Sequence, residues 1–263
     1  MGSYLNPGSF IFRNSLNSKI YVDKSGLIEK TNEYLNTEQR FLCVSRPRRF
    51  GKSMAANMLA AYYDCEENTA ELFDNLQISS CVSYREHLNQ YDVLKLNMQD
   101  FLSMTHEVSE MLKLLQSRLV SELKRKYPDY ITDEPLIFAM QDIFAQTRRP
   151  FVILIDEWDC LFREYKQDKE AQKQYLDFLR AWLKDKDYVA LAYMTGILPI
   201  KKYGSHSALN MFYEYSMTAP GEFAPYFGFT EEEVRMLCEE YHMNFEEAHD
   251  WYDGYGLTAH TLT

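Results

Sequence analysis

The stretch SRPRRFGKS at residues 45–53 constrains the fold of this chain more than any other segment. An apolar run precedes it at residues 41–44, and a helix-like stretch follows it at residues 54–61. The segment therefore predicts a strand, a loop and a helix in succession. This order places main-chain N–H groups at the N-terminus of a helix, an arrangement that attracts phosphate.

The last three residues of this loop have the chemistry of a nucleotide site. Gly51 permits close approach of phosphate, Lys52 can reach the outer phosphates, and Ser53 can bind Mg²⁺. The first glycine of the general pattern G-x-x-x-x-G-K-[ST] is replaced by Arg46. The predicted nucleotide-binding residues are Arg46, Pro47, Arg48, Arg49, Phe50, Gly51, Lys52, Ser53 and Met54. The three arginines could stabilise phosphate charge, or they could instead pair with acidic neighbours or face a partner.

A second motif, FVILIDEWD at residues 151–159, predicts a buried strand that ends in carboxylates. Ligands of open α/β sheets bind at the carboxyl ends of the strands. Asp156 is therefore the expected Mg²⁺ ligand, acting through water, and Glu157 the expected general base for an attacking water. A solvated acidic turn is the alternative for such a pair in isolation. The preceding strand, loop and helix favour the nucleotide site.

Short apolar runs alternate with longer helical patterns along the chain, which predicts an α/β fold with a mainly parallel sheet. The expected helices cover residues 53–63, 106–127 and 170–184. The five expected strands are Arg40 to Val44, Val93 to Met98, Phe151 to Ile155, Val189 to Met194 and Phe212 to Thr218.

The character of the sequence changes at Phe229, so we divide the chain into a core at 1–228 and a helical lid with a tail at 229–263. Thr230 with Glu233 forms a capping box, and Asn244 with Glu247 repeats the pattern. Gly254 suits the end of the second helix.

Composition limits the partners and the compartment. A formal charge of -11 disfavours general attraction to nucleic acid or an anionic membrane, and no apolar segment approaches the length of a membrane span. Five cysteines without a C-x-x-C pair fit neither a disulfide framework nor a zinc site. We expect a soluble, cytoplasmic protein that binds no nucleic acid directly and no membrane.

Several long motifs together resemble the AAA-ATPase-like proteins, a P-loop group usually found in bacteria. The resemblance covers residues from about 5 to 256 and rests on YVDKSGLIEK, RFLCVSRPRRFGKSMAANMLAAYYD, VILIDEWD, AYMTGILPI, EYSMTAPGEFAPYFGFTEEEV and WYDGY. It implies a three-layer P-loop NTPase sandwich that takes ATP and Mg²⁺. An arginine at the first-glycine position is usual in this group, so Arg46 follows the family pattern.

The resemblance has two further implications. Thr195 lies where such ATPases often place a residue that senses the γ-phosphate or positions water, although it could equally cap a strand before Gly196. Members of the family commonly continue into a nuclease-like domain after the WYDGY segment. The (D/E)-x-K motifs at residues 122–124 and 164–166 fall in helical patterns and are expected to be surface charge pairs, so we predict no nuclease activity for these residues.

Three functions are consistent with these motifs. The first is slow hydrolysis of Mg-ATP that drives or gates a protein partner or a C-terminal effector domain. The second is a nucleotide-dependent switch or scaffold with negligible turnover, favoured because no trans-acting arginine can be assigned. The third is a degenerate loop without nucleotide, and the complete set of Lys52, Ser53, Asp156 and Glu157 counts against it.

Overall fold

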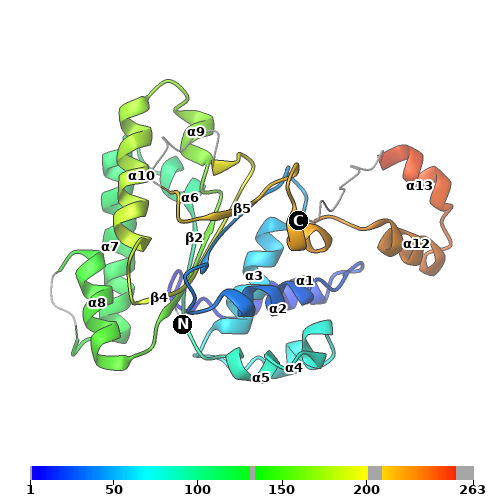
Figure 1. Ribbon diagram of the computed structural model, residues 1–263, viewed down its shortest axis with the longest axis horizontal. Helices are drawn as coiled ribbons and strands as arrows, with labels where there is room; N and C mark the ends of the chain where they lie inside the picture. The colour runs from blue at the N-terminus through cyan, green and yellow to red at the C-terminus, as the bar shows by residue number, and fades with distance from the viewer. Residues whose placement is uncertain (1, 131–133, 201–208, 253–263) are drawn as a thin grey trace.

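The computed structural model describes residues 2–130, 134–200 and 209–252. Five strands form one sheet in the order β2-β3-β4-β1-β5, and every neighbouring pair is parallel (Figure 1). The strands are β1 (Phe41–Ser45), β2 (Asp92–Asn97), β3 (Phe151–Asp156), β4 (Val189–Gly196) and β5 (Tyr213–Tyr215). The predicted parallel α/β sheet is confirmed, with each of the five strands in its expected part of the sequence.

The last strand is shorter than the prediction of residues 212–218. Pairing with β1 ends at Tyr215, because the Ser216 N–H turns to the carbonyl of Ala219 at 3.2 Å and closes a turn. Apolar and aromatic residues in this segment therefore extended the predicted strand beyond its real end.

Helices cover both faces of the sheet and follow the strand ends. Before β3 they are α1 (Phe10–Leu16), α2 (Gly26–Tyr34), α3 (Lys52–Tyr63), α4 (Ala70–Phe73), the 3-10 helix η1 (Gln77–Ser80), α5 (Tyr84–His87), α6 (Met98–Ser103), α7 (Val108–Lys126) and α8 (Leu136–Thr147). After β3 they are α9 (Cys160–Glu164), α10 (Lys169–Leu183), the 3-10 helix η2 (Gly221–Tyr226), α12 (Glu231–Glu240) and α13 (Phe245–Tyr252).

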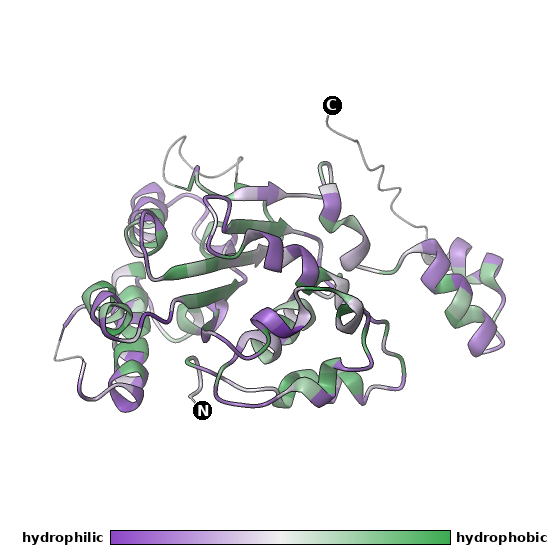
Figure 2. Cartoon of the chain, turned by 60° about the horizontal axis from the view of Figure 1, so that its bottom comes forward, coloured by the Kyte–Doolittle hydropathy of each residue, from purple (hydrophilic) through white to green (hydrophobic). Residues whose placement is uncertain are grey.

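Alternate residues of each strand enter one of two cores, which produces three layers. Cys43 of β1 packs in the core with α7, α8 and α10, whereas its neighbour Leu42 packs in the core with α1, α2 and α3. In Figure 2 the central strands are coloured mainly as hydrophobic, whereas the edge strand β5 and the helices carry hydrophilic residues as well. This arrangement confirms the expected P-loop NTPase sandwich.

The long helix α7 confirms its predicted apolar face. Its buried residues include Val108, Met111, Leu112, Leu115, Leu119 and Leu123. One expectation on this helix is wrong. Glu122 is buried and does not lie on the surface, because its carboxylate accepts the N–H groups of Ser3, Tyr4 and Leu5 at 2.8–2.9 Å.

The chain leaves the sheet after η2 and forms the two predicted C-terminal helices, α12 and α13, which stand to one side of the core (Figure 1). Thr230 and Glu233 make the predicted capping box, and Asn244 accepts the N–H groups of Glu246 and Glu247. Gly254, the expected stop of α13, lies outside the described residues. None of the helices in the described ranges has the length and hydrophobicity that crossing a membrane requires.

Candidate functional site

The carboxyl ends of β1, β4 and β3 bring the predicted site residues to one edge of the sheet. The loop after β1 leads into α3, whose first residue is Lys52. Gly51 caps this helix with φ +79° and ψ 9°, a left-handed conformation that glycine adopts without steric cost. A β-carbon at Gly51 would have no heavy atom within 4 Å, so backbone conformation alone requires glycine here.

Lys52 is folded back onto its own loop. Its Nζ donates to the carbonyls of Arg46 and Pro47, each at 2.9 Å, and the residue is only 6% exposed. Burial lowers the pKa of Lys52, while the carboxylates of Glu157 and Asp156 oppose that shift and Arg163 adds to it. The ammonium is thus held by neutral carbonyls, from which an anion of greater charge can draw it away.

Asp156 joins the phosphate loop to the neighbouring strand. Ser53 Oγ donates to its Oδ2 at 2.5 Å, and Thr195 Oγ1 donates to its Oδ1. Both contacts are possible because β4, which carries Thr195, lies between β1 and β3 in the sheet. Ser53 and Thr195, which are distant in sequence, therefore share the carboxylate of Asp156. The oxygens of all three residues are hard donors of the kind that Mg²⁺ prefers.

Glu157, the expected general base, stands in a sharp turn after β3. Its φ of +53° is left-handed, which is uncommon for a residue other than glycine, and such outliers concentrate at functional sites. Its carboxylate forms an ion pair with Arg163 of α9. Both side chains are mostly buried, at 24% and 20% exposure, so the pair lies in the edge of the site and not on the open surface.

The predicted loop residues do not all face the same way. Arg46 is fully buried and turns toward β5, where its Nη1 donates to the carbonyl of Tyr215 at 2.7 Å and its guanidinium lies 5.3 Å from the ring centroid of Phe227. Burial lowers its pKa to about 10. Neither its Nε nor its Nη2 has a hydrogen-bond partner among the described residues, and no ion pair of Arg46 occurs there. Arg48, Arg49 and Met54 are exposed.

Phe50 connects the phosphate loop to the segment that leads into α12. Its carbonyl accepts the Gly228 N–H at 3.1 Å. Gly228 has φ +74°, and a β-carbon there would lie 3.2 Å from the Phe50 ring. The loop is therefore in direct contact with the segment before α12, a relationship that the sequence did not reveal.

Two residues of the site, Asp159 and Arg163, were missed by the sequence reasoning. Asp159 is fully buried and accepts the N–H groups of Ile197 and Leu198 at 3.1 and 2.8 Å, just beyond Thr195. Arg163 Nε lies 3.5 Å from Asp159 Oδ2. The available signal was the i, i+4 spacing of an acid and an arginine directly after the acidic strand, which places both on one face of a helix.

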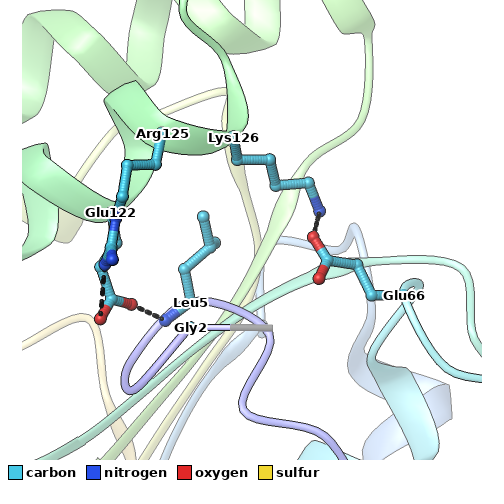
Figure 3. Close-up of a pocket in the computed structure, with 6 residues that line it drawn as sticks. All are labelled: Gly2, Leu5, Glu66, Glu122, Arg125 and Lys126. Carbon is cyan, nitrogen blue, oxygen red and sulfur yellow. Dashed lines mark hydrogen bonds and ion pairs between the residues drawn. The ribbon is translucent and has the colours of Figure 1, made fainter.

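A separate cavity of about 210 Å³ lies between the N-terminal segment and the end of α7 (Figure 3). It is remote from the phosphate loop, because its Lys126 contacts Asp92, the first residue of β2, whereas the loop lies at the opposite ends of the strands. The charges around it are paired with each other: Lys126 with Glu66 at 2.7 Å, and Arg125 with Glu122 at 3.4 Å. The cavity is thus lined by residues that fix the N-terminal segment.

Clusters of three or more His, Cys, Asp or Glu side chains suited to a metal ion are absent from the part of the chain that the structure describes. Donors for Mg²⁺ are present in another form. Ser53 and Asp156 already lie in hydrogen-bond contact beside the phosphate loop, and a hydroxyl with a carboxylate is the donor set that Mg²⁺ takes when phosphate supplies further oxygens. The residues present therefore fit this metal.

Comparison with known proteins finds a matching family model, a sequence relative and similar solved structures. A family model described as "Predicted AAA-ATPase" matches residues 12–205. An "Uncharacterized protein in vnfD 5'region" of Azotobacter chroococcum mcd 1 is 25% identical over 262 residues, with 92% of this chain and 46% of the relative covered, so the chain spans about half the length of that protein. Among solved structures, C. elegans PCH-2 is 14% identical with a TM-score of 0.34, covering 82% of this chain and 44% of PCH-2, too distant a likeness to support an argument.

Proposed function

The chain belongs to the family of predicted AAA-ATPases, and from that premise we propose that it binds Mg-ATP at residues 46–54 and hydrolyses it slowly. The observation that carries this proposal is the shared carboxylate of Asp156, which joins Ser53 of the phosphate loop to Thr195 of the neighbouring strand. Lys52 directly precedes Ser53 in the chain, and its side chain is buried.

The phosphate groups bind at the N-terminus of α3, where main-chain N–H groups and the helix dipole favour negative charge. Lys52 exchanges the two carbonyls that it now contacts for oxygens of the outer phosphates. Among the other residues of the loop, Gly51 allows close approach, and Arg48 and Arg49 are exposed at its rim. Arg46 contributes main-chain groups to the loop, while its side chain anchors the loop to β5.

Ser53 and Asp156 are the residues that would hold Mg²⁺, which supplies neutralisation of the phosphate charge when it is bound. Thr195 orients the Asp156 carboxylate through the second oxygen. Glu157 is the general base: it accepts a proton from the attacking water as that water bonds to the terminal phosphorus.

A nucleotide-dependent switch with negligible turnover is the second candidate. Two contacts favour it: the bond from Gly228 to Phe50, and the ion pair of Lys24 with Glu233 of α12 at 2.6 Å. Nucleotide that displaces the loop would strain the first contact and so move the helices at 229–252, which in this reading are a lid. A protein partner, or a C-terminal nuclease-like domain in a longer protein, would respond to that movement.

A thermal melt with increasing Mg-ATP tests the binding step. Ligand that binds only the native state at a hundredfold excess over its dissociation constant raises stability by about 2.7 kcal/mol. We expect a saturable rise in Tm for the wild type and for Lys173→Ala, an exposed lysine on α10, and none for Lys52→Ala. An equal rise in Lys52→Ala would contradict the assigned site.

Phosphate release then separates the two candidate functions. Glu157→Gln preserves the size of the side chain and removes its capacity as a base, so we expect ATP binding without turnover. Wild-type turnover that Glu157→Gln abolishes supports the ATPase. Saturable binding without measurable release in the wild type supports the switch.

A further inference from the structure

Arg163 is paired with Glu157, the proposed general base. It lies on the short helix α9, which follows the acidic turn after β3 and stands at the carboxyl edge of the sheet (Figure 1). Its Nη2 forms the ion pair with Glu157 Oε2. Its Nε is buried without a hydrogen-bond partner among the described residues, 3.5 Å from Asp159 Oδ2. The guanidinium therefore retains unused donor capacity.

The surroundings fix Arg163 beside the acidic turn after β3. Asp159, the N-cap residue of α9, is anchored to the segment after β4 by the N–H groups of Ile197 and Leu198. Arg163 follows one helical turn later, with its N–H bonded to the Asp159 carbonyl at 3.2 Å. Glu157, which holds the Arg163 guanidinium, directly follows Asp156, whose carboxylate accepts the hydroxyl of Ser53.

The ion pair conflicts with the proposed task of Glu157. A carboxylate oxygen that is engaged by a guanidinium is not free to receive a proton from an attacking water. The terminal phosphate of ATP is a stronger competitor for the arginine, since it has more negative charge and its oxygens match the planar fork of donors. Entry of ATP therefore offers Arg163 a second anion and releases Glu157 for its reaction.

We propose that Arg163 is a cis-acting arginine of the nucleotide site, held by Glu157 before nucleotide binds and transferred to the terminal phosphate oxygens when ATP is present. This inference rests on the proposed function. In the reaction, the water oxygen bonds to the terminal phosphorus while the bond from phosphorus to the bridging oxygen breaks, and its electron pair stays with ADP. Glu157 takes the water proton, Arg163 remains protonated throughout, and the products are ADP and inorganic phosphate.

The arginine contributes by stabilising charge on the transferred group, as arginines supplied in cis or in trans do in other P-loop enzymes. Arg48 and Arg49 are less suited to this task, because their side chains are exposed on the loop and neither is held against the acidic turn. Arg46 is turned toward β5. Arg163 is the arginine that the fold already holds against the base.

Binding of Mg-ADP with and without aluminium fluoride, a mimic of the transferred phosphoryl group, tests the proposal in Arg163→Gln, Arg163→Lys and a surface control, Arg180→Gln. We expect aluminium fluoride to tighten binding of Mg-ADP to the wild type and to the control. Arg163→Gln should bind Mg-ADP within about threefold of the wild type, lose most of the tightening, and turn over ATP about 10³-fold more slowly. Arg163→Lys should recover part of both effects, because it restores the charge without the planar fork.

Retention of the full tightening by Arg163→Gln would overturn the inference and leave the proposed function standing. Failure of the wild type to bind Mg-ADP or Mg-ATP would remove the proposed function and the phosphate role of Arg163 together. Thermal melts without nucleotide test the ion pair between Glu157 and Arg163. The decrease in Tm of the double variant Glu157→Gln with Arg163→Gln should be smaller than the sum of the decreases in the two single variants. Additive decreases would show that the pair does not form in solution and would count against the proposal.

Discussion

Gly228 donates its main-chain N–H to the carbonyl of Phe50 at 3.1 Å, so the phosphate loop is bonded directly to the segment that leads into α12. The bond lies next to Gly51 and Lys52, which belong to the proposed phosphate site. Any movement of the loop on nucleotide binding must break this contact or carry it along. The proposed lid is thus connected to the site through main-chain atoms, and not only through side chains.

Two glycine substitutions separate backbone strain from contact at this junction. Gly228→Ala and Gly51→Ala each place a side chain at positive φ, which costs about 1–2 kcal/mol. Only Gly228→Ala also brings a β-carbon to 3.2 Å from the Phe50 ring. We expect urea denaturation to show the larger loss of unfolding free energy for Gly228→Ala. Equal losses would mean that the Phe50 ring moves aside freely.

Substitution of Thr195 tests its hydrogen bond to Asp156. Thr195→Val removes a buried donor and leaves Asp156 Oδ1 with the Glu157 N–H at 3.0 Å, so we expect a loss of about 1–3 kcal/mol in unfolding free energy and slower turnover. Thr195→Ser keeps the hydroxyl and should restore turnover more than stability, because it lacks the methyl group. Denaturant titration and phosphate release measure the two effects. Turnover in Thr195→Val equal to that of the wild type would restrict this residue to capping the strand.

Removal of the metal should weaken nucleotide binding through Asp156. For the wild type we expect chelation of Mg²⁺ to lower ATP affinity by at least about tenfold, or about 1.4 kcal/mol. Asp156→Asn retains the shape of the side chain and loses its charge, so its weaker ATP affinity should no longer respond to Mg²⁺. Titration calorimetry with and without a chelator measures this. Asp177→Asn, an exposed substitution on α10, is the control and should keep the full response; a full response in Asp156→Asn would place the metal elsewhere.

The ion pair between Lys24 and Glu233 should hold α12 against the core. The Lys24 ammonium also donates to the carbonyl of Pro225 at 2.6 Å, so Lys24→Met removes two links at once. We expect faster hydrogen exchange in residues 231–240 and unchanged exchange in the strands, since the pair ties the first turn of α12 to a residue far from it in the sequence. Lys173→Met should leave both unchanged. Unaltered exchange at 231–240 in Lys24→Met would show that the helices are held by other contacts.

Glu66 should make the free energy of unfolding depend on pH in the acidic range. Burial raises its pKa, but hydrogen bonds from Lys126 and Asn6 outweigh burial and lower the pKa from 4.5 to about 2. Because the unfolded chain takes up the proton at higher pH, this stability is present above pH 4.5 and is lost as the pH falls toward 2. The drop in urea midpoint between pH 5 and about pH 3 should be smaller in Glu66→Gln than in the wild type. Parallel decreases would exclude Glu66 as a source of the acid dependence.

The sequence by itself determined the elements whose causes are local. A glycine followed by lysine and serine between an apolar run and a helix pattern predicted the loop between β1 and α3, since loop shape and helix start depend on adjacent residues. The apolar face of α7 followed from spacing along one helix, and the capping box of α12 from residues three positions apart. The ends of β5 were less predictable, because a turn closed by Ser216 competes with pairing at the edge of the sheet.

Only the tertiary structure decided which of these residues meet. The order of strands in the sheet placed Thr195 against Asp156, and the acidic turn placed Arg163 against Glu157. Arg46 belongs to the proposed phosphate loop, yet packing against β5 turns its side chain inward. Such contacts depend on the crossing of distant segments, and no periodicity or spacing in the chain records where segments cross. Local hydrogen bonds and amphipathic faces can therefore be predicted from the sequence, whereas the partners of buried charges depend on how the sheet packs.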